Sequence, residues 1–331
     1  MNHEPVRQAM LRACAEARRW LGSTSPNPAV GAAALDEAGK VLAVAAHQRA
    51  GGSHAEVLTL AACREAGVLG KVRTLCVTLE PCNHHGRTPP CVDAILAAGI
   101  GTVVVGVRDP NPRVAGGGIE RLTAAGVAVR VGVAEAACAQ LLHAFAFSSI
   151  AGRPWVTVKR AFTRAGSMIP PAGQTTFTTP ASLLLAHRLR KKADAILTGS
   201  GTILADDPQF TVRHLPDHPG RRRRLAILDR RRRVPAAYLD AARARGLDAR
   251  VYDTVEAALA DLHGEGVRDL LVEAGPALSD AILAAGGWCL AVDIRQGPDP
   301  GLPDEVSWRF NRAMPIPFDV AFFDPEAILP L

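Results

Sequence analysis

The sequence has few aromatic residues, no long apolar run and no set of cysteines suited to a disulfide framework. Phe, Trp and Tyr make up 5% of the 331 residues, which leaves little from which to build a base-stacking platform for nucleic acid. No apolar run is long enough to cross a bilayer, and the N-terminal MNHEPVRQAM lacks the apolar core of a signal peptide. Seven cysteines are too few, and odd in number, to staple a chain of this length. These absences favour a cytoplasmic protein with reduced thiols.

Positive charge is what the sequence has in excess. The net charge is +6, and two runs of four arginines stand at Arg221–Arg224 and Arg230–Arg233. Such runs can bind nucleic acid, but solvated surface loops are the more ordinary interpretation. A phosphorylated small molecule would also suit a basic protein.

Strand-like and helix-like segments alternate through the first half, which is typical of an α/β layered domain. The chain opens with an amphipathic helix, whose apolar residues recur at helical spacing from Val6 to Leu21 before Pro26 and Pro28. Strands are expected at 29–35, 41–46, 74–79, 102–107 and 127–131, and helices at 55–66, 91–98, 119–125 and 135–147.

A second α/β unit is expected after the linker Gly152–Pro154. Its strands are predicted at 155–160, 195–198, 224–228 and 269–273, with a helix at 183–192. The length suggests two domains, which we place at residues 1–150 and 151–331. Prolines accumulate after 297, where they are poorly suited to central strands.

The stretch LEPCNHHGRTPPC (Leu79 to Cys91) contains two cysteines with eight residues between them, and GGSHAE precedes it at 51–56. One imidazole and two thiolates, from His54, Cys82 and Cys91, would make a three-ligand zinc site with a fourth position open to water. Zinc in such a site lowers the pKa of the water toward neutrality. Glu56 would stand beside the metal as a proton shuttle and catalytic residue. His-x-Glu with Pro-Cys is typical of zinc-dependent deaminases of amino-heterocycles.

The general deaminase signature has two residues between the cysteines, not eight. HAEV with the longer LEPCNHHGRTPPC, and then RDPNPRVAGGG, resembles the deaminase domain of the bifunctional riboflavin-biosynthesis deaminase–reductase. The resemblance implies a cytidine-deaminase-like three-layer fold, in which the loop between the cysteines helps to hold a pyrimidine nucleotide. It places His84 on the substrate, although His84 and His85 could otherwise compete with Cys91 as zinc ligands. The implied substrate contacts are Asn27, His84, Arg87, Asp109 and Asn111. Ordinary turn chemistry would also explain Asn27, Asp109 and Asn111.

Three segments of the second half, RPWVTVKRAF, GSGTILADDPQFTVR and LLVEAGPALSDAIL, resemble the reductase domain of the same family. This resemblance implies a fold similar to dihydrofolate reductase and the use of NADPH. The implied substrate contacts are Thr175, Arg190, Phe210, Arg213 and Glu273. The implied NADPH contacts are Ala161, Phe177, Thr202, Asp206 and Gly275.

The reductase half departs from the family pattern at several positions. Ala165 stands where the family has an aspartate, and Phe177 where it has a tryptophan. Residues 286–331 match only vaguely.

The function that the resemblance implies is bifunctional. A zinc-dependent step would deaminate a phosphoribosylated diaminopyrimidine, and an NADPH-dependent step would reduce its ribose to ribityl, in a cytoplasmic homo-oligomer. Because the two sets of contacts lie on either side of Arg153, a fragment ending near Ile150 is expected to deaminate if it folds, and to deaminate poorly if dimerisation through the second domain supports it. Two alternatives stay open: a deaminase whose reductase-like half is inactive, and a nucleic-acid base deaminase that grips phosphates with its arginine runs.

Overall fold

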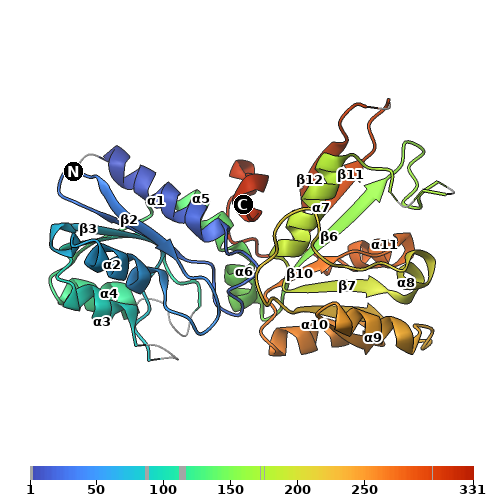
Figure 1. Cartoon of the computed structure of the whole chain (residues 1–331), viewed down its shortest axis with the longest axis horizontal. Helices are drawn as coiled ribbons and strands as arrows, with labels where there is room; N and C mark the ends of the chain where they lie inside the picture. The colour runs from blue at the N-terminus through green and yellow to red at the C-terminus, as the bar shows by residue number, and fades with distance from the viewer. Residues whose placement is uncertain (1–2, 86–88, 112–116, 172, 175, 300) are drawn as a thin grey trace. The chain divides into compact units, whose positions relative to one another are not determined.

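The chain folds as two units, each built on its own β-sheet (Figure 1). A computed structural model describes residues 3–85, 89–111, 117–171, 173–174, 176–299 and 301–331. The first unit comprises Met1–Ala151 and Pro317–Leu331, and the second comprises Gly152–Ile316. The second unit is therefore inserted into the sequence of the first.

The first unit has a five-stranded sheet in the order β2-β1-β3-β4-β5. The central strand β3 is parallel to β4, which is parallel to β5, whereas β1 is antiparallel to both β2 and β3. Helices connect the parallel strands, as such connections require. The strands are β1 (Gly31–Leu35), β2 (Val41–Ala46), β3 (Thr74–Leu79), β4 (Thr102–Val107) and β5 (Ala128–Val131).

Helices cover both faces of this sheet, so the three-layer arrangement expected from the sequence is confirmed. Alternate residues of β1 serve two cores: Ala33 packs in the core that contains α1 and α5, and Ala32 in the core that contains α2 and α3. Gly31 must be glycine, because a Cβ there would lie 2.0 Å from the carbonyl oxygen of Ala13 in α1. The helices are α1 (His3–Arg18), α2 (Ala55–Glu65), α3 (Cys91–Ala97), α4 (Gly117–Ala124), α5 (Glu135–Leu141) and α6 (His143–Ala151).

The last residues of the chain, Pro317–Leu331, pack on the first unit and form what we call the C-terminal strap. Ile328 and Leu329 are fully buried in it. Gln140 of α5 donates to the carbonyl of Phe322 (2.9 Å) and accepts from the N–H of Asp324 (2.7 Å). The expected second domain ran to residue 331, so its end is corrected to Ile316. Burial of the strap's apolar residues against the first unit is the physical reason.

The second unit has a seven-stranded sheet in the order β12-β11-β6-β10-β7-β8-β9. Every neighbouring pair is parallel except β11 and β12. The strands are β6 (Trp155–Phe162), β7 (Ala195–Gly199), β8 (Arg223–Leu228), β9 (Leu247–Tyr252), β10 (Asp269–Val272), β11 (Leu290–Arg295) and β12 (Glu305–Phe310). The helices are α7 (Pro180–Lys192), α8 (Ser200–Asp206), α9 (Ala236–Ala244), α10 (Val255–Gly264) and α11 (Pro276–Ala284).

Most of the predicted elements are present, with three differences. The helix expected at 135–147 is two helices, α5 and α6. Elements α8, α9, β9 and α10 were not predicted. Near the C-terminus, β11 and β12 are regular strands because Pro298 and Pro303 fall in the loop between them rather than inside either strand. No helix among the described residues is long and apolar enough to span a membrane.

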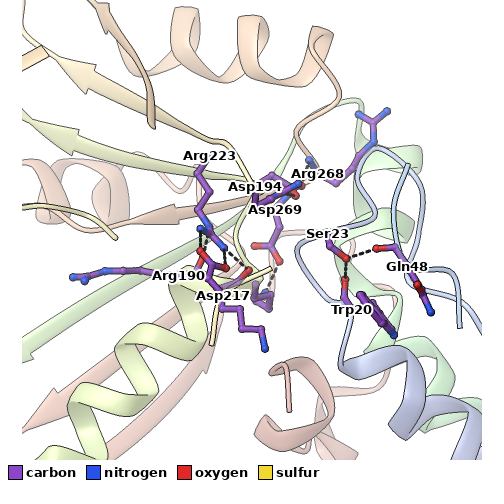
Figure 2. A network of polar contacts seen from close by, with 12 residues as sticks. Trp20, Ser23, Gln48, Arg190, Asp194, Asp217, Arg223, Arg268 and Asp269 are labelled. Carbon is purple, nitrogen blue, oxygen red and sulfur yellow. Dashed lines mark hydrogen bonds and ion pairs between the residues drawn. The ribbon is translucent and has the colours of Figure 1, made fainter. Parts of the chain in front are cut away.

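The first arginine run is not a solvated loop, as the sequence suggested, but part of an internal ionic network (Figure 2). Arg223 is buried and forms two bonds to Asp217 (2.6 and 2.7 Å), while it also donates to the carbonyl of Arg190 (2.8 Å). Arg221 pairs with buried Asp194 at 2.6 Å. These pairs fasten β8 to the end of α7, and they leave this run poorly placed to grip phosphates. The second run is exposed between β8 and α9, as expected of a surface loop.

Candidate active sites

The three predicted zinc ligands lie together at the ends of secondary-structure elements of the first unit. His54 is the residue before α2, Cys82 follows β3, and Cys91 begins α3. Their ligand atoms all lie within 4.8 Å of one another. His54 Nδ1 is 3.2 Å from Cys91 Sγ and 3.5 Å from Cys82 Sγ.

These distances fit a tetrahedral zinc ion, since Zn–N and Zn–S bonds of about 2.1 and 2.3 Å place the two ligand atoms about 3.5 Å apart. The chemistry of the donor set fits too. Hydrogen bonds from Cys91 and His54 lower the pKa of Cys82. This favours the thiolate form of Cys82, which is the form that binds metal.

Glu56, the candidate proton shuttle, is buried in the first turn of α2 beside this cluster. Burial raises the pKa of its carboxyl to about 7. A group that titrates near neutral pH can both accept and return a proton during a reaction. Its position and its protonation suit the predicted catalytic role.

A cavity of about 400 Å³ opens over the cluster. Asp109 and Asn111 reach it from the loop after β4, and both also form the turn that the sequence allowed, because the Asn111 N–H donates to Asp109 Oδ1 (2.8 Å). Arg87 lies outside the described residues. The predicted residues that line the cavity are Asn27, His54, Glu56, Cys82, His84, Asp109 and Asn111.

Sequence reasoning missed two polar residues that line this cavity, His47 and Glu80. The Nδ1–H of His47 donates to the carbonyl of Ser53 (3.0 Å), which leaves Nε2 to accept from the amide nitrogen of Asn27 at 3.2 Å. The oxygen of the Asn27 amide is then available to a ligand. Glu80 accepts from the N–H groups of Asp109 (3.2 Å) and Gly118 (3.1 Å) and so fixes the loop after β4. The sequence did contain a signal for Glu80, because a charged residue directly after the fully buried strand β3 indicates a functional position.

The second unit contains a larger cavity of about 980 Å³, at the upper end of the usual size of ligand and cofactor pockets. Nine predicted residues line it, while Thr175 lies outside the described residues. The nine are Ala161, Phe177, Arg190, Thr202, Asp206, Phe210, Arg213, Glu273 and Gly275. Sequence reasoning missed Lys159 and His187, which line the same cavity.

Arg190 does not present a free guanidinium to this cavity, although the sequence suggested it for a phosphate. It forms two hydrogen bonds to buried Glu273, at 2.6 and 3.1 Å. Burial alone would raise the pKa of Glu273, but Arg190 and Lys159 hold it below its usual value. Arg213 donates to the hydroxyl of Thr211 (3.0 Å) and is the more accessible candidate for an anion.

The cavity also has features that fit the phosphates of a dinucleotide. Gly275 precedes α11, whose N-terminus carries partial positive charge. The Gly275 N–H donates to the hydroxyl of Thr202 (2.9 Å), which joins the starts of α8 and α11. The predicted cofactor contacts Thr202 and Gly275 are thus brought together.

A deaminase-type zinc site in one unit, and a nucleotide-sized cavity over a mainly parallel sheet in the other, define a two-unit enzyme with a deaminase and a reductase-like part. Comparisons with known proteins agree for each part. Residues 4–107 match the family model of the cytidine and deoxycytidylate deaminase zinc-binding region, and residues 154–287 match that of the RibD C-terminal domain. The chain belongs to the RibD family of bifunctional deaminase/reductases of riboflavin biosynthesis.

Several relatives match this chain over most of its length. The riboflavin biosynthesis protein RibD of Mycobacterium tuberculosis is 40% identical over 294 residues, which are 86% of this chain and 84% of the relative. The solved structure of Acinetobacter baumannii RibD superposes on this chain with a TM-score of 0.77 at 30% sequence identity. The match covers 98% of this chain and 93% of the Acinetobacter chain. The solved structure of the Thermotoga maritima deaminase/reductase has a TM-score of 0.79 at 31% sequence identity. That match covers 92% of this chain and 90% of the Thermotoga chain. The reductase of this family uses NADPH.

Proposed function

We propose that the first unit deaminates a phosphoribosylated diaminopyrimidine and that the second reduces the ribose of the product to a ribityl chain. The observation that carries the proposal is the buried carboxylate of Glu56 beside a His/Cys/Cys cluster at the base of a cavity. The Thermotoga maritima relative is described as a diaminohydroxyphosphoribosylaminopyrimidine deaminase and 5-amino-6-(5-phosphoribosylamino)uracil reductase.

In the deaminase site, His54, Cys82 and Cys91 would hold the zinc. When bound, zinc supplies a water of lowered pKa as the nucleophile. Glu56 accepts the proton of that water and delivers a proton to the departing ammonia. Asn27, held by His47, presents its amide oxygen to the pyrimidine, and Glu80 holds Asp109 and Asn111 at the cavity wall. We place His84 and Arg87 on the substrate as well.

In the reductase site, NADPH supplies a hydride when bound. Ala161, Phe177, Thr202, Asp206 and Gly275 are the proposed cofactor contacts. Glu273 with Arg190 is proposed to orient the ribosyl part, together with Thr175 and the backbone of Phe210, whose side chain is buried in the core. Arg213 is proposed to bind the substrate's phosphate, because a guanidinium can bond it through two N–H groups at once.

The purified full chain tests this function directly. Incubated with the pyrimidine nucleotide alone, it should form the product in which oxygen replaces an amino group. With NADPH added, the product should gain two hydrogens. A chain that deaminates but neither binds nor oxidises NADPH with the deaminated product present would be a deaminase with an inactive second unit.

We expect about one tightly bound zinc per chain and much less in Cys91→Ser, because a hydroxyl is a poor replacement for a thiolate ligand. Metal analysis of the purified proteins measures this. Cys63→Ala is the matched control, since Cys63 is buried in α2 away from the cluster. Equal zinc in the wild type and Cys91→Ser would remove Cys91 from the ligand set.

Arg213→Ala should leave deamination unchanged and raise the KM of the reduction by roughly tenfold to 100-fold, because a hydrogen bond to a charged group contributes about 1.5–3 kcal/mol. Steady-state oxidation of NADPH with the deaminated nucleotide measures the KM, and deamination by the same sample is the internal control. An unchanged KM would show that Arg213 does not contact the phosphate.

We also propose that the protein works in the cytoplasm as a homo-oligomer. All seven cysteines are free, as expected in a reducing compartment. Light scattering of the full chain and fractionation of cells test the two points. A monomeric mass, or recovery outside the cytoplasmic fraction, would contradict the respective proposal.

A further inference from the structure

Helix α7 touches the loop that carries Arg213 at two positions one helical turn apart. We call residues Asp207–Arg213 the Arg213 loop. Arg190 donates to the carbonyl of Thr211 at 3.3 Å, and His187 accepts the backbone N–H of Arg213 at 3.0 Å. Residues three apart share one face of a helix, so a single face of α7 holds both the middle and the end of this loop.

The hydrogen bond to His187 requires one particular form of its ring. A backbone N–H can only donate, so Nδ1 of His187 must be unprotonated and the proton of the neutral ring must sit on Nε2. The His187 residue is 2% exposed, and its ring packs edge-on against that of His214, with ring centroids 4.5 Å apart. Burial, and then the positive charge of Arg190, lower the pKa of His187 to about 4 despite the opposing effect of Glu273. His214 and Arg213 also face the ring and act in the same direction.

The Arg213 loop needs such anchors because its backbone is strained. Phe210 has a φ of +53°, which a bulky residue adopts only when its surroundings enforce it. The Phe210 side chain is buried in the core, and the hydroxyl of Tyr238 donates to the carbonyl of Pro208 at 2.6 Å. These contacts hold the beginning of the loop, Arg190 holds its middle, and His187 holds the residue from which the Arg213 guanidinium extends.

We propose that His187 is a positioning residue for the reduction: its ring fixes the backbone of Arg213, so that the guanidinium is aimed at the phosphate of the ribosyl substrate. This inference rests on the proposed role of Arg213. It assigns to His187 no contact with the reacting atoms, and it predicts that the effect of His187 on substrate binding passes through Arg213.

Two substitutions of His187 separate hydrogen bonding from packing. His187→Phe keeps a ring against His214 but has no acceptor, whereas His187→Asn can place its amide oxygen near the position of Nδ1. We expect His187→Phe to raise the KM for the deaminated nucleotide about tenfold, the factor that corresponds to about 1.4 kcal/mol for a lost hydrogen bond. His187→Asn should recover most of that loss. The kcat at saturation and the Kd for NADPH, measured by fluorescence titration, should change little in both.

A double-mutant cycle decides whether His187 acts through Arg213. In the Arg213→Ala background, adding His187→Phe should raise the KM no further, and an additive rise would overturn the proposal. An unchanged KM in His187→Phe alone would also overturn it, as would equal impairment by Phe and Asn or a matching loss of NADPH affinity. If Arg213→Ala itself leaves the KM unchanged, it is the proposed role of Arg213 that fails first.

Discussion

Replacing Glu56 by glutamine is expected to lower the rate of deamination by about 100-fold or more, the usual contribution of a positioned acid–base group. Glutamine has nearly the same shape, but it cannot accept the proton of the nucleophilic water or pass one to the leaving ammonia. The zinc should remain, because none of the three ligands changes. Product formation and metal content of the same preparation are the two measurements.

Glu65→Gln is the matched control for this substitution, since Glu65 is an exposed carboxylate near the end of the same helix, α2. It should deaminate at the normal rate. Normal deamination by Glu56→Gln would exclude Glu56 from proton transfer. Loss of zinc from that variant would instead assign Glu56 a role in maintaining the metal site.

Ending the chain at Ile316 is expected to destabilise the first unit by about 4 kcal/mol or more. Truncating one buried isoleucine or leucine to alanine typically lowers the free energy of unfolding by about 2–5 kcal/mol. The strap contributes two such buried residues, Ile328 and Leu329. Such a loss is comparable with the whole stability of a typical domain, about 5–15 kcal/mol. The difference is measured by unfolding the full and the shortened chain in denaturant, with the release of zinc as the signal that reports unfolding of the first unit.

Single substitutions test the strap without shortening the chain. Ile328→Ala should lower the free energy of unfolding of the first unit, whereas Phe322→Ala should have little effect because the Phe322 residue is 71% exposed. Equal stability of the full and shortened chains would show that the strap is dispensable. The strap also changes the expectation for a fragment that ends near Ile150. That fragment lacks the strap, which covers α1 and α5 in the full chain, and should therefore deaminate poorly.

The parts of the site that the sequence predicted depend on short segments. His54 and Cys91 stand at the beginnings of helices, and Cys82 follows a strand. The predicted helices and strands are therefore enough to place the three residues at the same edge of a sheet. The family resemblance grouped Thr202 with Gly275, and in the structure each of them follows the end of a parallel strand. Strand periodicity likewise located β2, β3 and β4 at their observed bounds.

The parts that the sequence did not predict depend on partners far away in the chain. The pairing of Arg190 with Glu273 joins residues 83 positions apart, and no local pattern distinguishes such an arginine from one that binds phosphate. His47 and His187 carry no motif, and their roles become visible only with the hydrogen bonds that they accept. The strap was missed because its few apolar residues have no periodicity, and their burial depends on a surface made by the other end of the chain.

The insertion of the second unit into the sequence of the first has a consequence for synthesis on the ribosome. Domains usually fold as units in the order in which they emerge. Here the reductase unit is contiguous, so all of its residues are available before translation ends. The deaminase unit begins first, yet Ile328 and Leu329 leave the ribosome only after the whole reductase unit. The surface of the deaminase unit on α1 and α5 therefore stays uncovered throughout synthesis of the reductase unit, and that surface can be covered only once the strap has been made.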